Sequence, residues 1–462
     1  MSETQTIDAV AVQSRESAAE GALSVEAIAR LRGEFAANPA NRIAQNAITQ
    51  VTVDDIALNR EIVAATDHTF SRVLDDWSVT NQKRSGRCWM FAGLNLFRVG
   101  AMKQMGLKNF EFSQSYTMFW DKLERANYFL EAIIDTRERD ADDRTVAFLL
   151  SQPIEDGGQW NMFVNLVKKH GLVPKAFMPE TESSSSSMKM NSILRCKLRE
   201  GAKTLRDLHA AGAGEADLRA TKEEILGVIH RILCIHLGTP PERFTWQWTD
   251  LDKEFHREAD LTPHEFAAKF VDLPIDDYVC LVNDPRQSSP YGQTYTVEYL
   301  GNVVGGQIVT YLNVDIETMK QTAQRTIEDG EPVWFGCDVG KMMRRDLGIW
   351  DKELYDYPSI YQTEFDLDKA ARLTYHETQM THAMLFTGVD VVAGAARRWR
   401  VENSWGEENG RKGFYTMNDS WFDEYTFEIA ARKSYLSSEL QQALEREPIV
   451  LPAWDPMGAL AR

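Results

Sequence analysis

The segment from Gln82 to Trp89, Gln-Lys-Arg-Ser-Gly-Arg-Cys-Trp, constrains this chain more than any other stretch. The residues that follow, 89–102, are apolar on nearly every face, which predicts a helix buried on all sides. Cys88 then stands at the N-terminus of that helix, where unpaired N–H groups and the helix dipole favour an anion. A thiol in that place should ionise more readily, and the thiolate is the nucleophilic form. A buried structural cysteine would account for Cys88 alone, but not for Gln82 six positions before it and Trp89 directly after it.

A nucleophilic thiolate needs a base and a group that orients the base. His382 opens an apolar run that is typical of a buried strand, and Asn403 follows 21 residues later within Glu-Asn-Ser-Trp-Gly. His376 is the competing base, but polar residues follow it and we expect it at the surface. The sequence therefore predicts a catalytic triad of Cys88, His382 and Asn403.

These three stretches resemble the papain-like cysteine peptidases, whose signature around the nucleophile is Cys-Gly-Ser/Ala-Cys-Trp/Tyr. Ser85 and Arg87 depart from that signature. Cys88 and His382 are 294 residues apart, against roughly 130–150 in the family pattern, so an insertion must separate the catalytic halves. Further stretches resemble the bleomycin hydrolase family, whose bacterial members are called aminopeptidase C: residues 190–194, 244–246, 282–286, 333–341 and 451–461.

The resemblance implies an α+β fold of the papain type, with a helical lobe, a β-barrel-like lobe, a large helical insertion and an arm at each end. Together with the residue patterns, it predicts the following divisions: a mobile tail at 1–23, an N-terminal arm at 24–80, a helical lobe at 81–180, a helical insertion at 181–275, a β-rich lobe at 276–440 and a C-terminal arm at 441–462. The run of serines at 183–187 predicts a linker within this scheme.

The resemblance also implies roles around the nucleophile. The Gln82 side chain and the Cys88 backbone N–H would stabilise the oxyanion, and Trp405 would shield the hydrogen bond between His382 and Asn403, with Trp89 as a supporting residue. No metal or organic cofactor is needed for such chemistry.

The glycine pair Gly157-Gly158 permits a close approach of backbone to a ligand. In papain-like enzymes a glycine pair here lines the substrate cleft. A plain turn that opens a helix at Trp160 explains it equally well, and both interpretations stay open.

The C-terminus gains a role only from the resemblance. The resemblance implies that the C-terminal arm lies in the cleft and that a carboxylate at Ala461 or Arg462 attracts the free ammonium of a peptide. It also implies that the enzyme itself removes Arg462. This arrangement would make the protein an aminopeptidase.

The amino-acid composition limits which ligands and environments the protein is suited to. The net charge of −18 argues against a nucleic-acid-binding face. The five cysteines are widely spaced, so no disulfide framework is indicated and a reducing cytoplasm is expected. No apolar stretch is long enough to span a membrane. His230, Cys234 and His236 lack the spacing of a metal site, and we expect a core helix there.

The resemblance further implies a homohexamer that acts on peptides with a free N-terminus and hydrolyses bleomycin. Two alternatives belong to other classes: a nucleic-acid-binding protein with secondary peptidase activity, and a papain-fold acyl or amide transferase.

Overall fold

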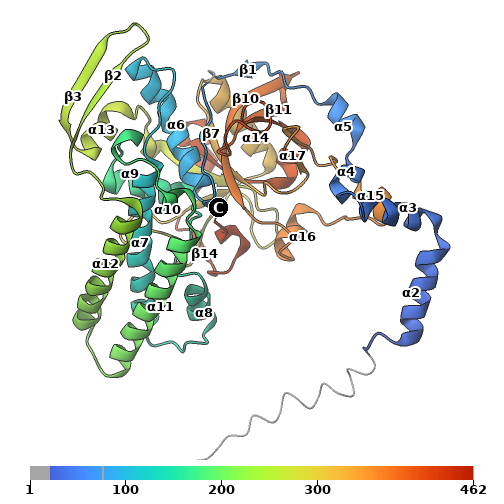
Figure 1. Ribbon diagram of the computed structural model, residues 1–462, viewed down its shortest axis with the longest axis horizontal. Coiled ribbons are helices and arrows are strands. Elements are labelled where there is room, and N and C mark those ends of the chain that lie inside the picture. The colour runs from blue at the N-terminus through green and yellow to red at the C-terminus, as the bar shows by residue number, and fades with distance from the viewer. Residues whose placement is uncertain (1–20, 75–76, 461–462) are drawn as a thin grey trace, which may run out of the picture. The chain divides into compact units, whose positions relative to one another are not determined.

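The computed structural model describes residues 21–74 and 77–460 (Figure 1). Residues 1–20 of the tail predicted at 1–23 lie outside the described residues, and so do Ala461 and Arg462. The chain forms two compact units, residues 1–60 with 355–365 and residues 61–354 with 366–462. The N-terminal arm predicted at 24–80 is therefore divided, because its last third belongs to the larger unit.

The smaller unit is built from short helices: α2 (Val25–Ala37), α3 (Pro39–Ile48), α4 (Val53–Ala57) and α15 (Tyr357–Tyr361). Ser24 caps α2 and Asn38 caps α3 through side-chain bonds to backbone N–H groups. Tyr357 Oη donates to Asp54 Oδ1 at 2.7 Å, which joins α15 to α4.

The helical lobe contains the predicted nucleophile, Cys88, at the start of its first helix. Its helices are α6 (Cys88–Met105), α7 (Gln114–Asp135), α8 (Arg144–Ser151) and α9 (Trp160–His170). The predicted helix at Cys88 is confirmed: α6 begins at that residue, is buried along most of its length, and ends at Gly106 in the left-handed conformation. Ser113 caps α7 by accepting a hydrogen bond from the Tyr116 N–H.

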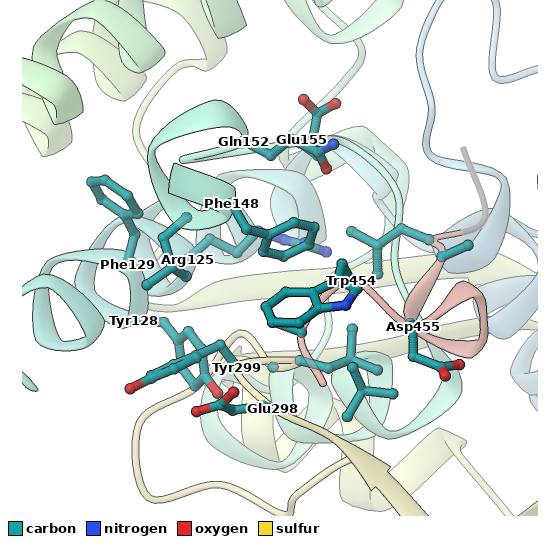
Figure 2. A pocket seen from close by; sticks show the side chains of 18 of the residues that line it. Arg125, Tyr128, Phe129, Phe148, Gln152, Glu155, Glu298, Tyr299, Trp454 and Asp455 are labelled. Carbon is teal, nitrogen blue, oxygen red and sulfur yellow. The ribbon is translucent and has the colours of Figure 1, made fainter. Parts of the chain in front are cut away.

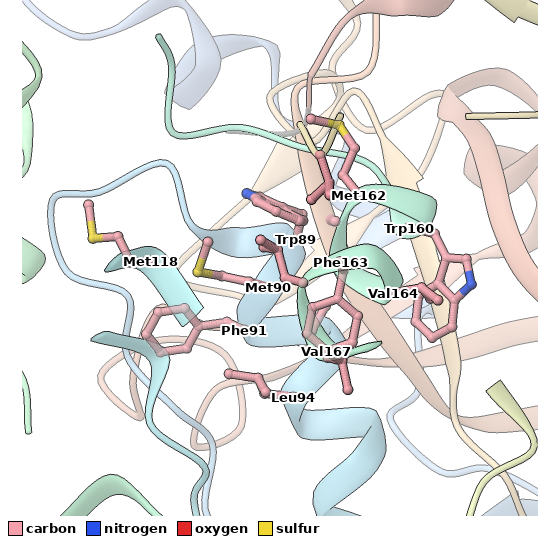
Figure 3. Close-up of a cluster of buried hydrophobic side chains, with 14 of the residues drawn as sticks. Trp89, Met90, Phe91, Leu94, Met118, Trp160, Met162, Phe163, Val164 and Val167 are labelled. Atoms are coloured by element: carbon pink, nitrogen blue, oxygen red, sulfur yellow. The ribbon is translucent and has the colours of Figure 1, made fainter. Parts of the chain in front are cut away.

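Part of the core of this lobe lies between α6 and α9 (Figure 3). Phe97 of α6 and Phe163 of α9 have ring centroids 5.1 Å apart. A Cβ at Gly93 would lie 2.6 Å from the Phe163 ring, so only glycine allows the two helices to come this close. The absence of a polar face on α6 thus reflects contacts on all of its sides.

The insertion at 181–275, expected to be mostly helix, contains a β-hairpin in addition to its helices. After α10 (Glu182–Ser185), α11 (Met188–Ala210) and α12 (Glu215–Leu237) come a hairpin of β2 (Phe244–Thr249) and β3 (Phe255–Leu261) and then α13 (Pro263–Phe270). Three tryptophan or histidine rings stack along the hairpin: Trp246, Trp248 and His256. The aromatic side chains pack on Phe110 and Phe266, which explains why a strand pair forms there. The serine run is not a linker, because it forms α10 and its flanks.

The large sheet forms the second lobe and has the strand order β14-β5-β6-β4-β13-β7-β10-β11-β12-β9-β8, with β1 paired to β10. Its strands are β1 (Arg72–Val73), β4 (Tyr278–Val282), β5 (Thr294–Val297), β6 (Tyr311–Asn313), β7 (Val333–Cys337), β8 (Met343–Arg344), β9 (Ile349–Trp350), β10 (His382–Val392), β11 (Ala395–Glu402), β12 (Phe414–Asn418), β13 (Thr426–Arg432) and β14 (Ile449–Leu451). Further helices of this unit are α5 (Arg60–Ala65), α14 (Ile316–Glu328), α16 (Lys369–Thr374), α17 (Asp419–Tyr425) and α18 (Ser438–Ala443).

The two lobes meet where α6 packs on β7 and β10. Trp334 of β7 donates its indole N–H to the backbone oxygen of Trp89 at 3.0 Å, and both side chains are fully buried. None of the described helices is both long enough and apolar enough to cross a membrane.

Candidate active site

Cys88 lies at the contact between the lobes. Its side chain is fully buried, and the backbone N–H groups of Ala383, Trp89 and Cys88 itself are directed at the sulfur. Ala383 directly follows His382 on β10, so the backbone beside the predicted base approaches the Cys88 sulfur from the opposite lobe.

His382 and Asn403 face each other at the ends of neighbouring strands. His382 begins β10 and Asn403 directly follows β11, with Nε2 of the histidine 2.9 Å from Oδ1 of the asparagine. This contact leaves Nδ1 of His382 as the ring nitrogen for a second partner. The Trp405 ring lies 4.9 Å from the His382 ring, centroid to centroid, and the two ring planes are tilted by 37°. His376, the rejected base, is exposed.

Gln82 is held in place by residues of both lobes. Its Nε2 donates to Ser85 O at 2.6 Å, its Oε1 accepts from Ser404 Oγ at 2.6 Å, and its backbone N–H donates to Ser404 O at 2.8 Å. Because an amide nitrogen carries two hydrogens, one N–H of the Gln82 side chain is still available as a donor.

Burial acts against charge at this site. It raises the pKa of the Cys88 thiol to about 12, although the three N–H groups near the sulfur favour the thiolate. Burial also lowers the pKa of His382 to about 4, while the hydrogen bond to Asn403 acts in the opposite direction. The lowered thiol pKa that the helix N-terminus predicts is therefore outweighed by desolvation, and only mutual attraction could charge both groups.

The glycine pair packs against the nucleophile segment. A Cβ at Gly158 would lie 2.5 Å from the indole of Trp89, and Trp89 Nε1 donates to Asp156 O at 2.7 Å. The Gly157 carbonyl accepts a hydrogen bond from Arg125. This packing explains Gly158 without a substrate, and the expected helix begins directly afterwards at Trp160.

Two carboxylates support the nucleophile segment and were missed by sequence reasoning. Asp156 accepts the Gly86 N–H at 3.1 Å and forms an ion pair with Lys122 at 2.6 Å. Glu180 binds the buried guanidinium of Arg87 through two bonds of 3.0 and 2.7 Å. Nothing in their local sequence distinguishes these acids from exposed ones, although Arg87, directly before the nucleophile, was visible as a departure from the family signature.

The C-terminal arm follows the sheet edge toward this region. Its strand β14 pairs in parallel with β5, Asp455 forms an ion pair with Arg286 at 2.9 Å, and the Ala459 carbonyl accepts from Gln159 Nε2 at 2.7 Å. Trp454 and Leu460 line a cavity of about 220 Å³ that also has α7 and α8 side chains in its wall (Figure 2).

Among the described residues, one group of three could hold a metal ion: Asp250, Glu254 and His256. They lie on the β2–β3 hairpin of the insertion, and His256 Nε2 is already 2.7 Å from Asp250 Oδ2. His230 and Cys234 are 3.8 Å apart on α12, while His236 bonds to Ser183 instead.

A two-lobed fold with a cysteine at a buried helix N-terminus, and a histidine–asparagine pair on the opposing sheet, defines a papain-like cysteine peptidase. Residues 22–458 match the model of the Peptidase C1-like family, and the chain belongs to that family.

Named relatives match along nearly the whole chain. Human bleomycin hydrolase is 45% identical over 449 residues, covering 95% of this chain and 99% of the relative. Aminopeptidase C of Listeria monocytogenes is 42% identical over 439 residues, again covering 95% of this chain and 99% of the relative. The crystal structure of PepW from Lactobacillus rhamnosis superposes with a TM-score of 0.94 at 45% identity, covering 96% of this chain and all of the other.

Proposed function

We propose that this protein removes N-terminal residues from peptides, with Cys88 as nucleophile, His382 as base and Asn403 as the group that orients the base. Family membership makes it a cysteine peptidase, and relatives named aminopeptidase C and bleomycin hydrolase support an aminopeptidase. The observation that carries the triad is the 2.9 Å contact between His382 Nε2 and Asn403 Oδ1, beside a cysteine sulfur that faces the N–H of Ala383.

In the proposed reaction, His382 Nδ1 already holds the proton of the Cys88 thiol, and the thiolate sulfur attacks the peptide carbonyl carbon. The oxyanion binds the free N–H of the Gln82 amide and the Cys88 backbone N–H, each worth on the order of 3 kcal/mol to the transition state. His382 returns the proton to the leaving amine as the C–N bond breaks. Water then attacks the thioester carbon while His382 takes one of its protons. The C–S bond breaks, which releases the N-terminal residue as a free acid and restores the Cys88 thiolate.

The resting state is proposed to be a thiolate–imidazolium pair. Burial opposes each charge separately, so the pair must gain or lose both charges together and its two apparent pKa values belong to the pair. The N–H groups of Ala383 and Trp89 at the sulfur, and Asn403 at the ring, favour the charged forms.

The C-terminal arm is proposed to restrict the cleft to free N-termini. Support comes from its attachment at Arg286, at Gln159 and along β5, which holds the described part of the arm as far as Ala459. The last residues, Ala461 and Arg462, would then face the ammonium of the substrate. Removal of Arg462 by the enzyme itself is part of this proposal.

Bleomycin hydrolysis, a hexameric assembly and a cytoplasmic location complete the proposal. The name of the human relative supports the first, and the five free cysteines support a reducing compartment.

The deciding experiment compares matched peptides with free and acetylated N-termini and measures released amino acid. We expect turnover of the free peptides alone, without an added acceptor amine, and none in Cys88→Ala. Mass spectrometry should show loss of one Arg from wild type but not from Cys88→Ala. Cleavage of both peptides at equal rates would refute the aminopeptidase, and release only with an added amine would favour a transferase.

A further inference from the structure

The serine run at 183–187 is an ordered part of the structure. Thr181 caps α10, with reciprocal bonds between the Thr181 and Ser184 side chains and backbones, and the Ser184 and Ser187 side chains are buried. Buried hydroxyl groups require hydrogen-bond partners, and the partners of these two serines connect them to the nucleophile segment, residues 84–88.

Ser187 reaches the nucleophile segment through Asp156. Its hydroxyl donates to Asp156 Oδ2, and the same oxygen accepts the backbone N–H of Gly86 at 3.1 Å. The other carboxylate oxygen, Oδ1, lies 2.6 Å from Lys122 Nζ and accepts a hydrogen bond from Asn191 Nδ2 at 2.7 Å. The Gly86 backbone, two residues before the nucleophile, is thus fixed by a carboxylate that Ser187 helps to hold.

Ser184 reaches the same segment through Glu180. Its hydroxyl donates to Glu180 Oε2 at 2.8 Å, and Glu180 binds Arg87 at both carboxylate oxygens. Arg87 is fully buried, directly precedes Cys88, and donates from Nε to Ser85 Oγ at 2.8 Å.

A backbone contact lies between these two side-chain contacts. The Arg84 N–H donates to Ser185 O at 2.9 Å, and Arg84 and Ser186 form a parallel β-bridge. On the far side, Ser183 Oγ lies 2.7 Å from His236 Nδ1 of α12. The serine run therefore connects the insertion to residues 84–87 at three successive points.

We propose that Ser184 and Ser187 are positioning residues for the nucleophile segment, and that this is a function of the insertion. The inference rests on the proposed function of Cys88 and Gln82. Residues 83–87 join Gln82 to Cys88, so their conformation sets the two oxyanion donors relative to the sulfur. No disulfide fixes this segment, since Cys88 and the other cysteines are free. Oxyanion donors act only when they are held in place before the reaction.

The test compares Ser184→Ala and Ser187→Ala with Ser185→Ala, a matched control whose contact to Arg84 uses only its backbone. Active sites are counted by titration with a peptidyl irreversible inhibitor that needs the assembled site to react with Cys88 and that leaves the exposed Cys196 unmodified. Because kcat is expressed per counted site, unfolded protein does not contribute. We expect kcat to fall on the order of tenfold in each single variant and on the order of a hundredfold in the double variant, because small misplacements of reacting groups have effects of that size. KM should stay within about twofold, as should both constants in Ser185→Ala.

Failure of the proposed peptidase function and failure of the positioning role would give different results in this experiment. If wild type releases no amino acid from peptides, the proposed function fails whatever the serines do. If wild type is active but kcat per counted site in both serine variants matches that of Ser185→Ala, the positioning role is wrong. A rise in KM with unchanged kcat would also overturn it, because it would place the serines in substrate binding.

Discussion

Glu402 accepts a hydrogen bond from Arg98, with Nη2 and Oε1 2.7 Å apart and both side chains almost fully buried. Arg98 belongs to the helix that begins at Cys88, and Glu402 directly precedes Asn403. Asn95 Nδ2 and Trp77 Nε1 also donate to the carboxylate, at 2.9 and 2.6 Å. One buried anion thus links the nucleophile helix to the strand that leads to the orienting asparagine.

Replacing Glu402 by Gln should destabilise the protein strongly. The change leaves Arg98 buried without its counter-charge, and loss of one partner of a buried pair costs about 3–5 kcal/mol. Denaturant unfolding should show that loss. Glu407→Gln, at an exposed acid in the following loop, is the control and should change the free energy of unfolding by less than about 0.5 kcal/mol. A loss below about 1 kcal/mol for Glu402→Gln would show that the pair is not needed in its charged form.

The pH dependence of alkylation should reveal the proposed ion pair. Burial raises the pKa of Cys88 to about 12, so in His382→Gln the thiolate fraction should rise about tenfold per pH unit between pH 7 and 10, and the iodoacetamide rate with it. In wild type the imidazolium should keep the rate nearly constant between about pH 6 and 9. Site-resolved mass spectrometry can use the exposed Cys196 as an internal reference. A steep wild-type profile like that of the variant would rule out the ion pair.

His382 should make the stability of Cys88→Ala depend on pH. Burial lowers the pKa of His382 to about 4, against about 6.5 when unfolded. Between these values the unfolded chain binds a proton that the folded chain does not, so the free energy of unfolding should fall as pH falls, by up to about 1.4 kcal/mol per unit. Subtracting the profile of Cys88→Ala/His382→Gln isolates the histidine, because the other groups titrate in both proteins. A zero difference would mean that the ring is protonated without penalty.

The C-terminal arm should lose its gating role when its anchor is weakened. Asp455→Asn removes the charge that pairs with Arg286, so acetylated peptides should be cut at a rate that wild type does not show. Deleting residues 458–462 should give a larger effect of the same kind. Glu447→Gln, at an exposed position of the same arm, should behave as wild type. If the deletion leaves the preference for free N-termini unchanged, the arm is not the gate.

Gly158→Ala should be far more damaging than an ordinary glycine substitution. Its Cβ would overlap the buried Trp89 ring, and a tightly packed core tolerates such additions poorly. We expect a loss of about 1–3 kcal/mol in unfolding free energy together with lower kcat. Gly227→Ala, on an open face of α12 with no atom within 4 Å, should instead stabilise by up to about 1 kcal/mol.

The sequence predicted those parts of the fold and of the candidate site that depend on a pattern of neighbouring residues. The apolar run after Cys88 predicted α6 from its first residue, and the strand that begins at His382 was visible as an apolar run. The same local patterns could not show that Asp156, Glu180 and Glu402 are buried, because each acid is neutralised by a basic residue distant in sequence. The prediction of a linker at the serine run was wrong for the same reason. Serine favours loops unless partners distant in sequence form hydrogen bonds with its hydroxyl group.

The buried bond between Trp334 and the Trp89 carbonyl has a kinetic consequence. It joins the two lobes directly behind the nucleophile, so they cannot separate there without exposing two indole rings and an unpaired N–H. We therefore expect the distance between the two lobes at this contact to stay constant while peptides bind and products leave. We expect the slow steps of substrate binding and product release to lie at the mouth of the cleft and not in an opening motion between the two lobes.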